Sequence, residues 1–395
     1  MIVAAVTETF PGERRVALIP ASVAPLVKAG WQVRIEAGAG RGAGFSDQQY
    51  IDKGAQVVSR VEALAADCLL QVRALGANPV AGTSDLANLR KGQVVIGLCD
   101  PLGQPAAAKT LADAGVTLFA LELVPRISRA QAMDVLSSQA SIAGYRAVLL
   151  AATTLPKMFP MMTTVAGTIT PAKVFVFGAG VAGLQAIATA RRLGAVVSAT
   201  DVRAAVKEQV QSLGARFVET TPAASAEAGG GYAKAMDEDF YKQQRAALLD
   251  VVAQQDVLIT TAAIPGKKAP TLVTAEMVEA MAPGSVIVDL AAERGGNCEL
   301  TKPDETVVVN GVSILGPANL AAEVPQHASQ MFAKNITTLL AHLTKDGKWN
   351  IDTTDEITRD TLVAKDGQIT SPAVRELLGI KPPEKDWMEG AIELE

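Results

Sequence analysis

The chain has 395 residues, 49% of them hydrophobic and 19% charged, with a formal net charge of −5 at pH 7. This length and hydrophobic content are sufficient for two ordinary domains, each with a buried core. The acidic balance and the 4% aromatic content provide neither a basic face nor stacking side chains, which argues against nucleic acid as a partner.

The first third of the chain alternates short β-rich runs with Ala/Leu-rich helical patterns. This alternation predicts a parallel sheet covered by helices. The predicted strands are 2–6, 31–37, 67–72, 94–99 and 116–122, and the predicted helices lie near 21–29, 60–66 and 105–114. The stretch Arg129–Ala152 has few charges, many alanines and no proline, which predicts one long buried helix able to bridge two domains.

A second alternation begins at Lys173. Its predicted strands are 174–177, 196–201, 215–219, 257–260, 286–290 and one around 306–315, with helices after the first strand and near 204–213 and 274–281. This order predicts the two βαβαβ halves of a doubly wound sheet. A long interruption rich in Ala, Gly and acidic residues predicts a functional loop, and a helical pattern at 330–343 leads into a polar tail.

The expected fold is therefore α/β, with two Rossmann-like domains, each a mainly parallel sheet flanked by helices, and a cleft between them. The first domain comprises residues 1–136 completed by the C-terminal segment 319–395. The second comprises residues 137–318, with a mobile loop at 220–242. The three cysteines are widely spaced and predict neither a disulfide framework nor a zinc site, and no export signal or membrane-crossing apolar run is evident.

A glycine-rich turn carries the most specific chemical signal. The segment Gly178–Gly183 fits G-x-G-x-x-G, directly follows an apolar strand and opens a helix. In this pattern the first glycine makes the tight turn, the second admits the pyrophosphate, and the third lets the helix pack closely on the strand. The turn predicts a dinucleotide site at the positive end of the helix dipole. A turn that only packs a helix on a sheet is the alternative.

The choice of cofactor depends on Asp201, at the end of the next predicted strand. Its carboxylate can accept hydrogen bonds from the adenosine ribose hydroxyls and repels a 2′-phosphate, which favours NAD over NADP. Arg203 weakens this inference, because an arginine at that place can pair with a phosphate.

Several segments spread over nearly the whole chain point to one family. They are PGERRVALIP (11–20), RISRAQAMDVLSSQASIAGYRAV (126–148), VFVFGAGVAGLQAIATARRLGA (174–195), ATDVR (199–203), GGYAK (230–234), TTAAIPGKKAP (260–270), GSVIVDLAAERGGN (284–297) and FAKN (332–335). Together they resemble the NAD(H)-binding domain I, or alpha-1 subunit, of proton-translocating NAD(P) transhydrogenase, a relative of alanine dehydrogenase.

The resemblance implies a subunit that binds NADH and passes hydride directly to NADP⁺ held by a separate subunit, while membrane subunits couple the transfer to proton movement. It implies a catalytic loop around the nicotinamide formed by Arg126, Gln131 and Asp134. The residues that it implies for cofactor binding are Ser137, Gly178, Gly180, Val181, Ala182, Gly183, Asp201, Val202, Arg203, Gly231, Tyr232, Ala262 and Ala263. Tyr232 would lie near the tip of the loop that closes over the nucleotide.

These implied roles are chemically reasonable. The amide of Gln131 can both donate and accept, which suits a ribose hydroxyl or the partner's nucleotide, and Arg126 can pair with Asp134 to hold the loop. The alternative is that these three residues cap and solvate the start of the helix expected at 129–152. For Tyr232 the alternative is a partly buried loop aromatic.

Two other functions remain open from the sequence. Alanine dehydrogenases use an arginine, a lysine, a histidine and an aspartate around the substrate, and the matching positions here are Arg14 or Arg15, Arg73, Leu98 or Cys99, and Glu293. The histidine is absent, although oxidation of an amine needs a general base. This activity is therefore the second candidate, with Arg14 and Arg15 otherwise a solvated or salt-bridged turn. A non-catalytic NAD-sensing protein is the third.

The resemblance also implies partners and a location. It implies a homodimer that associates with NADP-binding and membrane-spanning subunits, peripheral on the cytoplasmic face of a bacterial membrane. The chain stops at Glu395 without a membrane helix, which fits either the split-subunit form of the family or a truncation.

Overall fold

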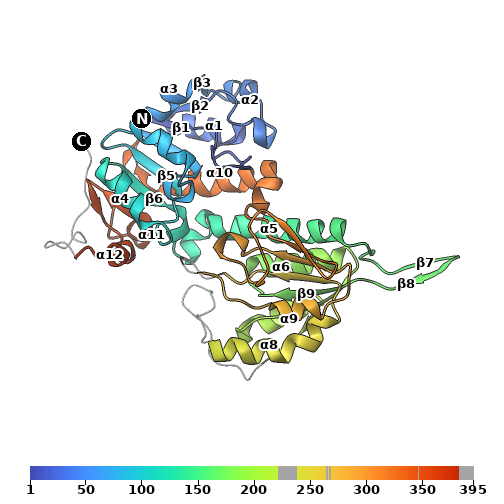
Figure 1. Cartoon of the computed structure of the whole chain (residues 1–395). Helices are drawn as coiled ribbons and strands as arrows, with labels where there is room; N and C mark the ends of the chain where they lie inside the picture. The colour runs from blue at the N-terminus through green and yellow to red at the C-terminus, as the bar shows by residue number, and fades with distance from the viewer. Residues whose placement is uncertain (221–237, 264–265, 267, 346, 382–395) are drawn as a thin grey trace. The chain divides into compact units, whose positions relative to one another are not determined.

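The computed structural model describes residues 1–220, 238–263, 266, 268–345 and 347–381 (Figure 1). The chain forms two compact units, Met1–Gln139 with Ala322–Glu395, and Ala140–Ala321. Each unit contains one large sheet that is mainly parallel and is flanked by helices. The predicted α/β class is therefore confirmed.

The sheet of the first unit has eight strands in the order β19-β18-β6-β5-β4-β1-β2-β3. Strands β1 to β6 pair in parallel, and β18 and β19 extend the sheet antiparallel beyond β6. The strands are β1 (Ile2–Ala5), β2 (Gln32–Glu36), β3 (Gln56–Val58), β4 (Cys68–Arg73), β5 (Val94–Leu98), β6 (Thr117–Ala120), β18 (Leu362–Lys365) and β19 (Gln368–Ile369). The helices are α1 (Pro20–Lys28), α2 (Asp47–Ile51), α3 (Arg60–Leu64), α4 (Pro105–Asp113), α10 (Pro325–His342), α11 (Glu356–Thr361) and α12 (Pro372–Leu378).

Alternate side chains of these strands enter two cores, one on each face of the sheet. Val94 and Ile96 of β5 pack in the core that contains Phe332 of α10. Val95, between them, packs in the opposite core with Leu111 of α4. Because side chains alternate along a strand and both faces are covered, the central strand β5 is a continuous apolar run, VVIGL.

The sheet of the second unit has the order β11-β10-β9-β12-β13-β15-β14, with only β14 antiparallel to its neighbour. The strands are β9 (Lys173–Phe177), β10 (Val196–Thr200), β11 (Arg216–Phe217), β12 (Val257–Thr260), β13 (Val286–Asp289), β14 (Thr306–Val309) and β15 (Val312–Leu315). The helices are α5 (Val135–Thr154), which begins in the first unit, α6 (Val181–Arg192), α7 (Lys207–Ser212), α8 (Glu238–Ala253) and α9 (Ala275–Glu279). The strand order reverses between β9 and β12, which is the switch point of a doubly wound sheet.

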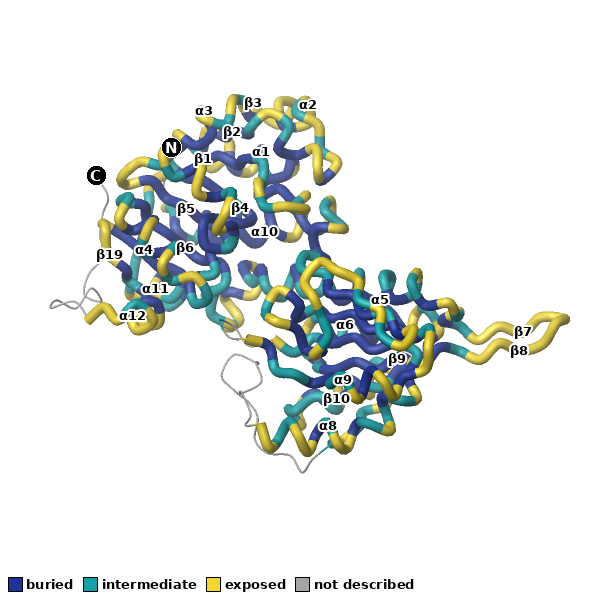
Figure 2. Tube along the Cα trace, in the orientation of Figure 1, coloured by how far each residue is buried: buried dark blue, intermediate teal, exposed yellow. Residues whose placement is uncertain are grey.

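Several segments differ from the sequence-based expectation, and one of them is the loop expected at 220–242, in which helix α8 already begins at Glu238. The helix expected over Arg129–Ala152 begins only at Val135, because the residues Ser128–Met133 form a 3₁₀ turn that is followed by Asp134. The single strand expected around 306–315 is the hairpin β14–β15, turned at Asn310 and Gly311 with φ values of +50° and +80°. A further hairpin, β7 (Met162–Thr164) and β8 (Gly167–Ile169), was not predicted, and all of its strand residues are exposed (Figure 2).

Candidate functional site

The register of the second sheet brings three strand ends to one edge. Phe177, the last residue of β9, is paired with Thr200 of β10 and with Thr260 of β12. The segments that follow these strands therefore leave the sheet together at the switch point. In open α/β sheets, ligands bind at this place, beyond the carboxyl ends of the strands.

The glycine turn after β9 is tightly packed on one side and open on the other. Gly178 has a φ of +92°, and its N–H donates to the Thr200 carbonyl at 2.9 Å. A Cβ at Gly183 would lie 1.9 Å from the Gly178 carbonyl oxygen, so only glycine lets α6 pack this closely. At Gly180 the nearest described atom to an added Cβ is Arg203 Nη2, at 3.9 Å. The N-terminus of α6 thus has the close packing and the open approach that a pyrophosphate requires.

Asp201, directly after β10, connects this turn to Arg203. Its Oδ2 accepts hydrogen bonds from the Ala179 amide at 2.7 Å and from Arg203 Nη2 at 2.8 Å. Its Oδ1 accepts from the Arg203 amide and from Arg203 Nε, both at 2.9 Å. The side chains of Asp201 and Arg203 are only 5% and 12% exposed. The acidic residue predicted to meet the ribose therefore lies at the turn, with the arginine bound to it.

A buried asparagine that sequence reasoning did not single out holds the segment after β12. Asn297 Oδ1 accepts from the Ala262 amide at 3.0 Å, and Asn297 Nδ2 donates to the carbonyls of Ala262 and Pro270, both at 2.9 Å. The Asn297 amide donates in turn to Asp289 Oδ2 at 2.7 Å, and Asp289 is fully buried at the end of β13. Ala262 is thus held in place, while Ala263, the other predicted residue here, is exposed. In the sequence, the only indication of these hydrogen bonds was the polar segment GGN, which lies a few residues after the strand VIVDL.

The four residues predicted for the nicotinamide loop lie in one segment of the first unit. Arg126 is exposed, and Gln131 is exposed within the 3₁₀ turn η5 (Ser128–Met133). Asp134 accepts hydrogen bonds from the Ser137 amide at 2.9 Å and from Ser137 Oγ at 2.6 Å. These bonds make Asp134 the cap of α5, which is the structural alternative considered for it.

Two partners distant in sequence hold this segment. Asn335 of α10 donates through Nδ2 to the Ala132 carbonyl at 2.9 Å and accepts at Oδ1 from Ser138 Oγ at 2.7 Å. Arg129 Nη2 lies 2.7 Å from Asp355 Oδ2. The sequence had indicated neither contact, although Asn335 ends the motif FAKN.

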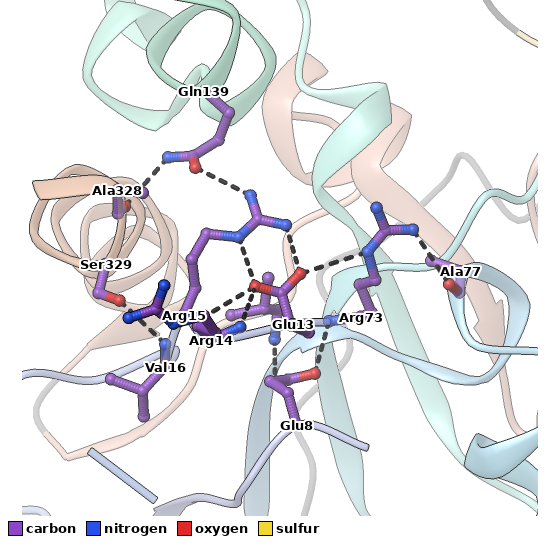
Figure 3. Close-up of polar contacts among 11 residues, drawn as sticks. Glu8, Glu13, Arg14, Arg15, Val16, Arg73, Ala77, Gln139, Ala328 and Ser329 are labelled. Carbon is purple, nitrogen blue, oxygen red and sulfur yellow. Dashed lines mark hydrogen bonds and ion pairs between the residues drawn. The ribbon is translucent and has the colours of Figure 1, made fainter. Parts of the chain in front are cut away.

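A separate charged cluster lies at the switch point of the first sheet, beyond β1 and β4 (Figure 3). Arg15 donates through Nε and Nη2 to the two carboxylate oxygens of Glu13, at 2.8 and 2.6 Å, and through Nη1 to Gln139 Oε1 at 2.9 Å. Arg73 Nε lies 3.4 Å from Glu13 Oε2. Glu8 accepts from the Val72 and Arg73 amides, and its burial and the nearby Glu13 raise its pKa to about 8. Arg15 is therefore part of a buried ion-pair network.

The side chains of the other residues considered for amino-acid oxidation have different surroundings, although the Arg14 amide donates to Glu13 Oε1 at 3.2 Å. Arg14 is exposed, and Glu293 is exposed in a short 3₁₀ turn. Cys99 is buried, and its thiol donates to the Gly97 carbonyl at 3.3 Å. One of the two positions matched to the missing histidine thus carries a thiol, and burial raises the pKa of this thiol well above its usual value.

Two predicted residues, Gly231 and Tyr232, lie outside the described residues. Among the helices that the structure describes, none is long and apolar enough to cross a bilayer.

Two family profiles match the chain. The profile described as alanine dehydrogenase/PNT, N-terminal domain matches residues 4–143, and the profile of the C-terminal domain matches residues 147–372. A Rhodospirillum rubrum protein, named as the first part of NAD(P) transhydrogenase subunit alpha, is 48% identical over 381 residues, covering 95% of this chain and 99% of the relative. The crystal structure of transhydrogenase from Sinorhizobium meliloti is 45% identical, with a TM-score of 0.82, and the match covers 94% of this chain and 100% of that one. Alanine dehydrogenase from Bacillus subtilis is a more distant relative, 31% identical over 98% of this chain and 97% of its own length.

Proposed function

The chain belongs to the alanine dehydrogenase/PNT family and, within it, to the NAD(P) transhydrogenase alpha subunits, and from this we propose that it binds NAD(H) and exchanges hydride with NADP(H) held by a partner subunit. The single observation that carries the proposal is the glycine turn at the switch point, with Asp201 bonded to it at Ala179. The open approach at Gly180 suits the pyrophosphate, and the carboxylate beside it suits the ribose. When bound, the nicotinamide supplies or accepts the hydride.

The proposed roles of the first-unit residues follow from their chemistry. Gln131 offers an exposed amide that can donate to and accept from a ribose hydroxyl or the partner's nucleotide. The capping bonds of Asp134 to Ser137 and the bond of Asn335 to the Ala132 carbonyl hold the backbone that presents this amide. We propose that the Arg126 guanidinium donates to the Asp134 carboxylate, which also accepts from Ser137.

The reaction proposed here needs no acid–base residue in this chain. Hydride transfer between two nicotinamides moves no proton, whereas oxidation of an amino acid requires a base to accept one. Arg15, one of the two arginines matched to the one that such a substrate would need, has a side chain that is 3% exposed and is bonded to Glu13 and Gln139. These contacts support the transhydrogenase reaction over amino-acid oxidation.

We also propose that the subunit works as a homodimer joined through the hairpin β7–β8. A two-stranded hairpin is at most marginally stable in water by itself, and exposed apolar groups mark interaction surfaces. Met161, Val165 and Ile169 are 66%, 111% and 40% exposed, and the hairpin extends away from the sheet of its own unit (Figure 1). A second copy of the chain is the proposed occupant, because the family resemblance implies a homodimer.

The name of the Rhodospirillum rubrum relative supports further partners, because it describes the first part of one subunit of a larger enzyme. We propose that these partners are an NADP-binding subunit and membrane-spanning subunits that couple the hydride transfer to proton movement. The chain would then act at the inner face of a bacterial membrane.

Reconstitution tests the proposed reaction. The purified chain is mixed with the NADP-binding subunit, NADH and an oxidised NADP analogue, and hydride transfer is followed by absorbance in a rapid-mixing instrument. Fast transfer supports the proposal, alanine-dependent reduction of NAD⁺ supports the amino-acid dehydrogenase, and NADH binding with neither reaction supports a sensor.

Gln131→Asn tests the role of the exposed amide in the same experiment. We expect normal NADH affinity with slower transfer, because the shorter side chain keeps the amide but misplaces it. Gln211→Asn, at an exposed glutamine of α7, is the matched control. Full-rate transfer by Gln131→Asn would show that the proposed role is wrong.

A further inference from the structure

The ion pair between Asp201 and Arg203, beside the glycine turn, indicates how this site excludes NADP(H). Three donors of Arg203, its amide, Nε and Nη2, bond to the Asp201 carboxylate. The fourth bond to that carboxylate comes from the Ala179 amide in the turn itself. Both side chains are largely buried, so the pair is held in one arrangement rather than fluctuating in solvent.

The guanidinium lies at the open side of the turn. Arg203 Nη2 is the described atom nearest to the place where a Cβ of Gly180 would stand, at 3.9 Å. In a Rossmann site the acidic residue after the second strand meets the adenosine ribose hydroxyls, so a 2′-phosphate would arrive next to Asp201 and Arg203. An arginine fork is the group that proteins use most effectively to bind such a phosphate.

We infer that Asp201 has a second effect besides repelling a 2′-phosphate, because it occupies the donors of Arg203 that would otherwise bind this phosphate. Arg203 is therefore a specificity-determining residue whose affinity for a 2′-phosphate is masked by its neighbour. The inference rests on the proposed function, because it requires NAD(H) at this turn. Removing the carboxylate is therefore expected to strengthen the binding of a 2′-phosphate, and not only to weaken NADH binding.

The variant that tests this must remove the charge and keep the turn. Asp201→Asn retains an oxygen that can accept from the Ala179 amide, and it weakens the bonds to Nε and Nη2 of Arg203 because a neutral amide binds a guanidinium weakly. Asp201→Ser keeps a smaller acceptor and serves the same purpose if the asparagine variant does not fold. Thermal melting of each variant checks folding before binding is measured.

The experiment measures the Kd of NADH and of NADPH by isothermal titration calorimetry on the full chain. Relative to wild type, Asp201→Asn is expected to weaken NADH binding about tenfold and to strengthen NADPH binding about tenfold or more. The double variant Asp201→Asn/Arg203→Ala is expected to lose the gain for NADPH. As a matched control, Asp201→Asn/Arg192→Ala keeps the gain, because Arg192 is exposed at the far end of α6.

Each possible outcome either supports or contradicts the inference. A folded Asp201→Asn or Asp201→Ser protein with no gain in NADPH affinity overturns it, as does a gain that persists without Arg203. A wild-type protein that binds neither nucleotide would instead overturn the proposed function, so the two failures are distinguishable.

Discussion

Asn297 binds both main-chain polar groups of Ala262: its Oδ1 accepts from the Ala262 amide at 3.0 Å, and its Nδ2 donates to the Ala262 carbonyl at 2.9 Å. A third hydrogen bond, from the same Nδ2 to the Pro270 carbonyl, connects Asn297 to a second point farther along the chain. Because Asn297 is fully buried and bonded to Asp289, it cannot turn away. Ala262, close to the end of β12, is therefore held in one conformation at the edge of the sheet where the nucleotide is proposed to bind.

Asn297→Ala is expected to weaken both folding and nucleotide binding. It leaves three main-chain groups without their partner and should lower the free energy of unfolding by about 2–4 kcal/mol. NADH affinity should fall about tenfold, since the segment around Ala262 is no longer held in place. Denaturant unfolding and NADH titration measure the two effects. Asn350→Ala, at an exposed asparagine, is the control, and unchanged NADH affinity in a folded Asn297→Ala protein would contradict the positioning role.

Alanine at two glycines of the same turn should impair different properties. At Gly183 it should lower the stability of the fold, and at Gly180 it should weaken nucleotide binding. Gly183→Ala places a Cβ 1.9 Å from a carbonyl oxygen, so we expect a loss of about 3 kcal/mol or more in the free energy of unfolding. Gly180→Ala meets its nearest described atom only at 3.9 Å, so the protein should fold normally yet bind NADH at least about tenfold less tightly. Equal melting temperatures for the two variants would refute this division.

Asn335→Ala should slow hydride transfer without changing NADH affinity. The side chain bonds to the Ala132 carbonyl and to Ser138 Oγ, on either side of Asp134. Without it, the segment that presents Gln131 is less ordered, and we expect transfer about tenfold slower. Rapid-mixing kinetics at saturating NADH, together with a separate Kd measurement, make the comparison. The neighbouring exposed residue supplies the control Lys334→Ala, and a transfer rate equal to wild type in Asn335→Ala would rule out the role.

Glu122 should make the first unit less stable as the pH rises. Burial is the largest cause that raises its pKa, from 4.5 to about 7, although its Oε1 accepts from the Cys99 and Asp100 amides. A raised pKa in the folded state means that the contribution to stability is complete below pH 4.5 and is lost as the pH rises through about 7. The free energy of unfolding should fall by up to about 1.4 kcal/mol per pH unit within that window.

Glu122→Gln removes this titration with little change of shape. Among the described residues, no donor bonds to Glu122 Oε2, so the amide nitrogen of glutamine can take its place without meeting another donor. Urea unfolding between pH 5 and 9 should show a flatter dependence for the variant than for wild type. Parallel curves would show that Glu122 does not titrate in this range.

Val165→Asp should convert the proposed dimer to monomers. The residue is 111% exposed at the tip of the β7–β8 hairpin, so the charge has no cost in the isolated chain. Buried against a second copy it would be strongly unfavourable. Sedimentation velocity measures the dissociation. Val308→Asp, at an exposed valine on the edge strand β14, is the control, and dimers that persist in Val165→Asp would exclude the hairpin from the interface.

Sequence reasoning succeeded where a few adjacent residues determine both conformation and chemistry. The turn from Gly178 to Gly183 could be predicted in full, because each glycine answers a local steric demand. Strand and helix positions in the two sheets were largely predictable from hydrophobic alternation. The hairpin β7–β8 could not be predicted, because its residues pack on no core and therefore show no burial pattern.

The amino-acid sequence by itself determined the doubly wound fold class, the glycine turn and the acidic residue beside it, since periodicity and short motifs record local requirements. Only the tertiary structure decided that Arg203 is bound by Asp201, that Asn297 holds Ala262, and that Asn335 holds the backbone near Gln131. Most of these partners are far apart in the chain, and hydrogen bonds that close over such distances leave no periodic signal. They form because the register of parallel strands and the packing of α10 bring the groups within 3 Å of one another.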